Sequence, residues 1–98
     1  MLTMLNDLRD ECYQNALLKG FHDEKREVGT ALALIHSEVS EALEAHRHGN
    51  IEEFAEELAD IIIRTLDTAG SENIDIGQAV VDKMSKNRQR SRLHGKNY

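Results

Sequence analysis

Two pairs of carboxylates stand out, because each pair has the three-residue spacing that places side chains on one side of a helix. The pairs are Glu38 with Glu41, and Glu57 with Asp60. Residues three apart on a helix are neighbours, so each pair presents its oxygens in a common direction. If the two helices pack together, four anionic groups meet, and they repel one another unless a cation lies between them. Hard oxygen ligands of this kind favour Mg²⁺, with Mn²⁺ as a substitute.

Other metal chemistries fit the sequence less well. Di-iron helical bundles use a Glu-x-x-His pattern, and no histidine in this chain has a glutamate three residues before it. Zinc sites use clustered Cys or His ligands, whereas Cys12 is the single cysteine. An all-oxygen site therefore indicates Mg²⁺ in phosphate chemistry, where the ion holds substrate phosphates and lowers the pKa of an attacking water.

The charge of the chain is divided between an acidic body and a basic end. Residues 1–82 hold all 18 acidic residues, whereas residues 83–98 hold half of the 12 lysines and arginines and no acid. Within the basic segment, Lys83, Asn87 and Arg90 recur at helical spacing and suit phosphate oxygens. The alternative interpretation of such a run is a solvated tail. A nucleic-acid partner is disfavoured, because the acidic body repels a polyanion.

Four helices account for nearly the whole chain, and capping residues and glycines mark their ends. We expect helices from about Thr3 to Leu18, from Asp23 or Glu24 to His48, from Asn50 to Ala69, and from Asp75 to about Arg92. Gly20, Gly49 and Gly70 follow the first three helices and fit their C-terminal stops. Short connections make neighbouring helices antiparallel. The expected fold is therefore all-α, a four-helix bundle that forms one domain over residues 1–98.

Apolar stripes on the second and third helices determine where the acids lie. On the second helix the predicted stripe consists of Val28, Leu32, Ile35, Val39, Ala42 and Leu43. On the third helix it consists of Ile51, Ala55, Leu58, Ile62, Leu66 and Ala69. An isolated pair of glutamates is usually solvated surface. Because both acidic pairs border stripes on consecutive helices, we expect the acids to lie near the seam between the helices.

Length and composition limit the chain to one small domain. With 98 residues, 31% of them charged, and no proline, it suits packed helices with a modest core, so an oligomer is expected. The single cysteine excludes an internal disulfide and fits a reducing compartment, and we expect it to be a small buried side chain. There is no signal-peptide pattern and no apolar run of about 18 residues, so we expect a cytoplasmic protein without a membrane partner.

The acidic segments and the basic end together resemble the MazG-like all-α nucleoside triphosphate pyrophosphohydrolases. The resemblance rests on residues 34–45, which read LIHSEVSEALEA, and on residues 56–61, which read EELADI. Residues 83–90, KMSKNRQR, are similar to the dCTP pyrophosphatase branch of that superfamily. Phe21 and His22 stand where the same branch has an aromatic–histidine pair near the base pocket.

The resemblance implies Mg²⁺-dependent hydrolysis of (deoxy)nucleoside triphosphates to the monophosphate and pyrophosphate, and it suggests a role in cleansing the nucleotide pool. The four acids would hold the metal, and Glu41 would take the proton of the attacking water. Further contacts with the substrate are assigned to Lys83, Asn87, Arg90, Phe21, His22, Lys96 and Tyr98. The family implies a homodimer or a homotetramer, in which the basic residues reach the acids of the same or a partner subunit.

Two alternatives from other classes stay open. A non-catalytic module would bind a nucleotide or a partner helix, hold Mg²⁺ weakly and release no pyrophosphate. A structural helical oligomer would carry the acids as a solvated face. In that case Glu57→Gln and Asp60→Asn would leave stability unchanged or raise it, because like-charge repulsion is relieved, and there would be no activity to lose.

Overall fold

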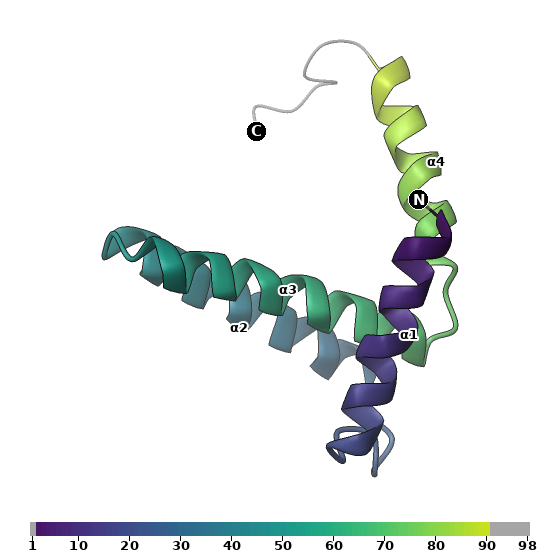
Figure 1. Cartoon of the computed structure of the whole chain (residues 1–98), viewed down its shortest axis with the longest axis horizontal. Coiled ribbons are helices and arrows are strands. Elements are labelled where there is room, and N and C mark those ends of the chain that lie inside the picture. Colours follow the sequence, from purple (N-terminus) through teal and green to yellow (C-terminus); the bar gives the residue numbers. More distant parts are fainter. Residues whose placement is uncertain (1, 91–98) are drawn as a thin grey trace.

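The computed structural model describes residues 2–90, which form four α-helices and no strand (Figure 1). The helices are α1 (Leu2–Leu18), α2 (Val28–Arg47), α3 (Ile51–Ser71) and α4 (Ile76–Gln89). The all-α prediction is thereby confirmed. No helix within the described residues combines the length and the apolar character needed to cross a membrane. Lys96 and Tyr98, both predicted to contact substrate, lie outside the described residues.

The second helix begins later than predicted. Residues 19–27 form turns and an extended segment, and α2 starts at Val28 rather than at residues 23–24. Gly20 has a φ of +83°, and its carbonyl accepts a hydrogen bond from the Asp23 backbone N–H. The acids after Gly20 therefore belong to a turn that follows α1, and they do not open the next helix.

The prediction that Gly70 ends the third helix is wrong, because Gly70 lies inside α3. α3 continues to Ser71, and the left-handed residue after it is Asn73, with a φ of 55°. A Cβ atom at Gly70 would lie 2.7 Å from the Cβ of Tyr13 on α1. The glycine is therefore needed for the close approach of α1 to α3.

α3 and α4 each begin after a residue whose side chain caps the helix. The Asn50 side chain accepts the backbone N–H of Glu53, and the Asp75 side chain accepts that of Gln78. The Asp75 carboxylate also accepts from the Asn6 side chain on α1, which joins the start of α4 to α1. α4 ends at Gln89, before its predicted end.

The helices are arranged as a hairpin with a crossing pair at its open end (Figure 1). α2 and α3 lie side by side, and α1 crosses α3 near the end at which α3 finishes. α4 packs on α1 and points away from the hairpin. The seam between α2 and α3 is thus the part of the fold that positions the predicted acids.

The core of the described chain consists mainly of small side chains. The buried hydrophobic residues are Cys12, Ala16, Ala31, Ala42, Ala45, Leu66 and Ala69. By contrast, Leu32 and Val39 of the predicted stripe are 50% and 49% exposed, and Ile62 is 54% exposed. The prediction that the stripe packs in the core is wrong at these positions, because α2 instead buries Ala31, Ala42 and Ala45. Small side chains let the two helices approach closely, and the larger apolar side chains remain on the outer side.

Candidate metal centre and adjoining cavity

Glu38, Glu41 and Glu57 converge at the seam between α2 and α3, and we call these three residues the acid cluster. Each offers one carboxylate oxygen, and the three oxygens all lie within 4.8 Å of one another. Glu38 is buried, Glu57 is half-buried and Glu41 is exposed. The cluster therefore opens from the helix seam to the solvent, and it unites three of the four carboxylates that the spacing singled out.

Asp60, the fourth predicted ligand, lies at the edge of the acid cluster and does not belong to the group of converging oxygens. It follows Glu57 by about one turn of α3, and its charge contributes to the raised pKa of Glu57. Asp60 also lines the largest cavity beside the cluster. Asp60 is thus near enough to affect Glu57 and also belongs to the wall of that cavity.

Crowding makes one of these carboxyl groups hard to ionise. Burial, followed by the charges of Glu41, Glu38 and Asp60 and a hydrogen bond with Glu41, raises the pKa of Glu57 from 4.5 to about 7. A carboxyl group reaches a pKa near neutrality when burial and neighbouring negative charges both disfavour its ionised form. A divalent cation among these oxygens would remove that penalty, and an all-carboxylate set of donors matches Mg²⁺ or Mn²⁺. The residues present therefore fit such an ion.

Arg64 on α3 brings a positive charge to the acid cluster. Its Nε donates a hydrogen bond to Glu38 Oε1 at 3.0 Å. The pairing offsets the cost of burying the Glu38 carboxylate. No functional role is predicted for Arg64 from the sequence, although Arg64 follows Asp60 by four residues and Glu57 by seven. Those spacings place all three side chains on one face of α3.

A cavity of about 450 Å³ adjoins the acid cluster, and we call it the α1–α3 cavity. Its walls come from α1, from the segment between α1 and α2, from α2 and from α3. The polar, charged and aromatic residues in its walls are Asn15, Lys19, Phe21, Arg26, Glu38, Asp60, Arg64 and Asp67. An enclosure of this size, with an aromatic ring, several cations and a carboxylate wall, suits a small anionic ligand that coordinates a metal.

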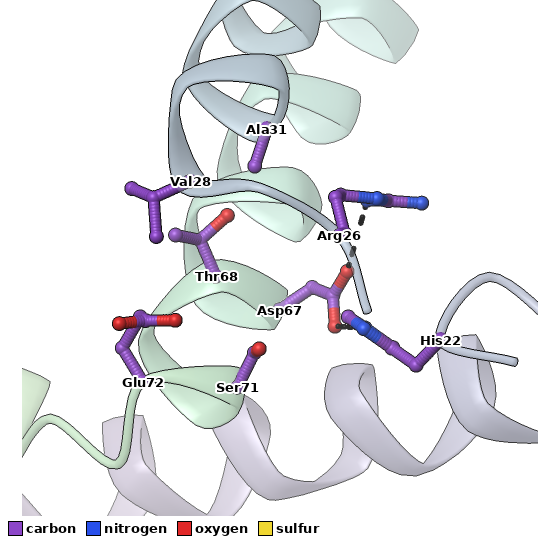
Figure 2. Close-up of a pocket in the computed structure, with 8 residues that line it drawn as sticks. All are labelled: His22, Arg26, Val28, Ala31, Asp67, Thr68, Ser71 and Glu72. Atoms are coloured by element: carbon purple, nitrogen blue, oxygen red, sulfur yellow. Dashed lines mark hydrogen bonds and ion pairs between the residues drawn. The ribbon is translucent and has the colours of Figure 1, made fainter. Parts of the chain in front are cut away.

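His22 points to a buried carboxylate, Asp67 on α3, and it does not line the α1–α3 cavity (Figure 2). Its Nε2 lies 2.8 Å from Asp67 Oδ1, and Arg26 Nη1 lies 3.8 Å from Asp67 Oδ2. The Tyr13 ring packs edge-on against the imidazole, with centroids 5.1 Å apart. We call His22, Arg26 and Asp67 the Asp67 clamp. It fastens the segment between α1 and α2 to α3.

The pocket inside the Asp67 clamp is too small for a substrate. It has a volume of about 10 Å³, enough for a single water, and its other walls include Val28 and Thr68 (Figure 2). The clamp does, however, position two residues of the larger cavity. Arg26 donates to the Phe21 carbonyl at 3.3 Å, and its guanidinium lies 5.8 Å from the centre of the Phe21 ring. The predicted aromatic contact, Phe21, therefore does line the α1–α3 cavity.

The predicted phosphate-binding residues lie apart from the acid cluster within one chain. Lys83 and Asn87 are exposed on α4, and Arg90 directly follows its end. None of the three lines the α1–α3 cavity, and α4 points away from the α2–α3 hairpin (Figure 1). The described chain thus gathers the acids but does not bring these basic residues beside them.

A family model described as the MazG nucleotide pyrophosphohydrolase domain matches residues 26–93, a span that contains α2, α3 and α4 and leaves out α1. Neither the comparison with curated proteins nor the one with solved structures finds a match. The matched span includes the whole acid cluster and Arg64. The chain therefore belongs to the MazG nucleotide pyrophosphohydrolase domain family, whose members are metal-dependent hydrolases that act on nucleotides.

Proposed function

We propose that the protein hydrolyses (deoxy)nucleoside triphosphates to the monophosphate and pyrophosphate with Mg²⁺ at the acid cluster. One observation carries the proposal. Oxygens of Glu38, Glu41 and Glu57 lie within 4.8 Å of one another beside a cavity of about 450 Å³. Membership of the MazG family supports the type of reaction. The proposed setting is the cytoplasm, where such an activity would cleanse the nucleotide pool.

The acid cluster would hold the metal, with Asp60 at its edge. Mg²⁺ bound there would neutralise the triphosphate and acidify a water near the phosphorus under attack. Mn²⁺ is the expected substitute, because it accepts the same oxygen ligands. Glu38 is buried and paired with Arg64, whereas Glu41 is the exposed member of the cluster. Glu41 is therefore the carboxylate best placed to take a proton from a water that enters from solvent.

The α1–α3 cavity is the proposed place for the nucleoside. Phe21 presents an aromatic ring that is 57% exposed, on which a base can stack. Asn15 on α1 adds an amide that can donate to and accept from a base edge. Both residues precede the span that matches the family, which begins at residue 26. We therefore infer that base preference is set by α1 and the segment after it.

A second copy of the chain is the proposed partner, because one copy leaves several large apolar side chains half-exposed on its hairpin. These residues, between 44% and 54% exposed, are Leu32, Val39, Leu43, Leu58 and Ile62. Covering them would extend the thin core at roughly 25 cal/mol per Å² of apolar surface. In such a dimer, or a dimer of dimers, Lys83, Asn87 and Arg90 would reach the acid cluster of the partner chain.

The reaction is tested by measuring pyrophosphate release from a panel of unmodified and damaged nucleoside triphosphates, with Mg²⁺ and with EDTA. We expect pyrophosphate and monophosphate in equal amounts with Mg²⁺, and neither product in EDTA or with the Glu41→Gln variant. Glu44→Gln is the matched control, since Glu44 lies three residues further along α2 and is exposed. Release of orthophosphate, or hydrolysis that survives chelation, would contradict the proposal.

The partner contribution is tested by mixing two inactive variants, Glu57→Gln and Lys83→Ala. If α4 completes the site of the partner chain, each mixed dimer has one intact site out of two. Because about half of the dimers in a random mixture are mixed, about a quarter of all sites are intact and about a quarter of the wild-type activity returns. If α4 serves its own chain, no mixed dimer has an intact site and activity stays absent. The mixture is compared with each variant alone at the same total concentration.

A further inference from the structure

Arg64 stands between the acid cluster and the α1–α3 cavity and belongs to both. Its Nε donates to Glu38 Oε1 at 3.0 Å, and the same side chain lines the cavity. The Arg64 side chain is 36% exposed, whereas that of Glu38 is 10% exposed. The guanidinium is therefore anchored at its inner side to a buried carboxylate and can be reached by a ligand from the cavity.

The anchor of Arg64 is also one of the carboxylates that would bind the metal. Glu38 offers an oxygen to Arg64 and belongs to the three residues whose oxygens lie within 4.8 Å. A guanidinium and a divalent cation that share one carboxylate repel each other, and a half-buried site screens that repulsion only weakly. Arg64 thus stabilises the metal-free acid cluster and opposes the binding of a metal there.

The free donors of Arg64 suit the substrate of the proposed function. A guanidinium has five N–H donors in a planar fork. Of the five donors of Arg64, only Nε–H bonds to a described residue. The remaining donors match the spacing of phosphate oxygens. Because the side chain already lines the cavity, rotation about its terminal torsions suffices to aim the fork at a ligand.

We propose that Arg64 is an internal counterion that holds Glu38 in the metal-free protein and turns to a substrate phosphate in the loaded protein. The inference rests on the proposed function and deepens it, because it names a phosphate-binding residue supplied by the same chain as the acid cluster. Arg26 also lines the cavity, but its guanidinium is committed to Asp67 and to the Phe21 carbonyl. Neither of those partners belongs to the acid cluster, so Arg26 does not exchange with a metal.

Two binding measurements on Arg64→Gln and Arg64→Lys test the proposal. The first is calorimetric titration with Mn²⁺ alone at about pH 8, where most acid side chains are ionised. Arg64→Gln removes the competing charge, so we expect Mn²⁺ to bind about tenfold more tightly. Arg64→Lys keeps the charge and should stay close to the wild type. Arg47→Gln, exposed at the end of α2, removes one charge elsewhere and should change nothing.

The second measurement uses a nucleoside triphosphate with a nonhydrolysable α,β bridge, in the presence of saturating Mg²⁺. We expect about tenfold weaker binding of this analogue to Arg64→Gln, because a phosphate partner is lost. Arg64→Lys should also bind it more weakly, since an ammonium cannot reproduce the fork. The opposite signs of the two effects of Arg64→Gln separate the proposal from a purely structural role, which would weaken both affinities or neither.

The proposal is overturned if Arg64→Gln leaves Mn²⁺ affinity unchanged or lowers it, or if it leaves the affinity for the analogue unchanged. A thermal melt establishes whether each variant folds. If Arg64→Gln does not fold, Arg64→Lys decides: unchanged Mn²⁺ affinity with weaker analogue binding supports the proposal, and unchanged analogue binding overturns it. If the wild type releases no pyrophosphate, the proposed function fails while these titrations still decide the role of Arg64.

Discussion

Two groups of charged side chains share α3 and differ in how their charges are balanced. In the acid cluster, three carboxylates have one cation, Arg64, among them. In the Asp67 clamp, one buried carboxylate has two basic partners. In the first group, burial together with the neighbouring negative charges raises the pKa of Glu57 to about 7. In the second group the buried side-chain nitrogen and oxygen atoms all have hydrogen-bond partners, as they do throughout the described residues.

The difference distinguishes the proposed metal site from a group that stabilises the fold. A folded chain avoids unbalanced charge, because desolvated charges of one sign cost free energy. A surplus that persists at a helix seam is therefore a sign of a cation from outside the chain, whereas a balanced group is complete by itself. The Asp67 clamp also serves the acid cluster indirectly, since it fixes the segment that carries Phe21 to the wall of the α1–α3 cavity.

The comparison predicts its largest effect for Glu57→Gln, which removes a charged ligand from the acid cluster. We expect pyrophosphate release to fall about a hundredfold or more. The stability of the metal-free protein should not fall, because like-charge repulsion is relieved. Glu56→Gln is the matched control, since Glu56 is the preceding, exposed residue of α3. Equal activities of the two variants would assign the acid cluster to the solvated surface.

The opposite outcome is expected for Asp67→Ala, which breaks the balanced group. It leaves two basic side chains without their buried partner, so the free energy of unfolding should fall by about 3 kcal/mol in a urea titration. Mn²⁺ affinity should change little, because Asp67 is not part of the acid cluster. Asp7→Ala on the exposed side of α1 is the control and should leave stability nearly unchanged. Similar losses in both variants would show that the clamp contributes nothing special.

The acid cluster could be predicted because its signal is local. Three-residue spacing fixes the side of a helix on which a side chain lies, whatever the helix packs against. The N-cap hydrogen bonds of Asn50 and Asp75 are local in the same sense. Arg64 and Asp67 were missed although a usable signal existed. With Asp60 they alternate in charge at helical spacing along α3, which indicates pairing on that face.

The packing face of α2 could not be predicted from apolar periodicity alone. Hydropathy alone predicts that leucine and valine are buried, whereas close packing of two helices requires small residues such as alanine at the contact. In this hairpin the small residues form the contact. Ala42 and Ala45 are buried while Leu32 and Val39 stay half-exposed. The direction of α4 was equally beyond reach. It depends on contacts with α1, among them the bond from Asn6 to Asp75, that connect residues far apart in sequence.

A smaller effect is expected for Gly70→Ala, which disturbs the contact between α3 and α1 beside the Asp67 clamp. The new Cβ would meet Tyr13, whose ring packs on His22 of the Asp67 clamp. Overpacking and improved helix propensity act in opposite directions, so the net loss of stability should be about 1 kcal/mol. Mn²⁺ affinity should be unchanged. In the control, Gly29→Ala, the added methyl meets only the flexible end of Glu27, and stability should rise slightly.

The last effect concerns the pH dependence of stability and tests the raised pKa of Glu57 directly. Because the folded-state pKa of Glu57 is raised from 4.5 to about 7, its contribution to stability is full below 4.5 and is lost as the pH rises through 7. Melting temperatures in EDTA should therefore decline between about pH 5 and about pH 8 more steeply for the wild type than for Glu57→Gln.

Saturating Mn²⁺ should reverse the relation between the two proteins. Protons compete with the metal for Glu57, so stabilisation by Mn²⁺ should grow with pH in the wild type and grow less in the variant. The shifted pKa values of Asp75 and Cys12 do not disturb this window. The pKa of Asp75 is lowered from 3.8, chiefly by the hydrogen bond from Asn6, and the pKa of Cys12 is raised from 9.0, chiefly by burial. If the melting temperatures of both proteins declined equally with pH in EDTA, the three carboxylates would not interact electrostatically. The difference in charge balance between the acid cluster and the Asp67 clamp would then have no effect on stability.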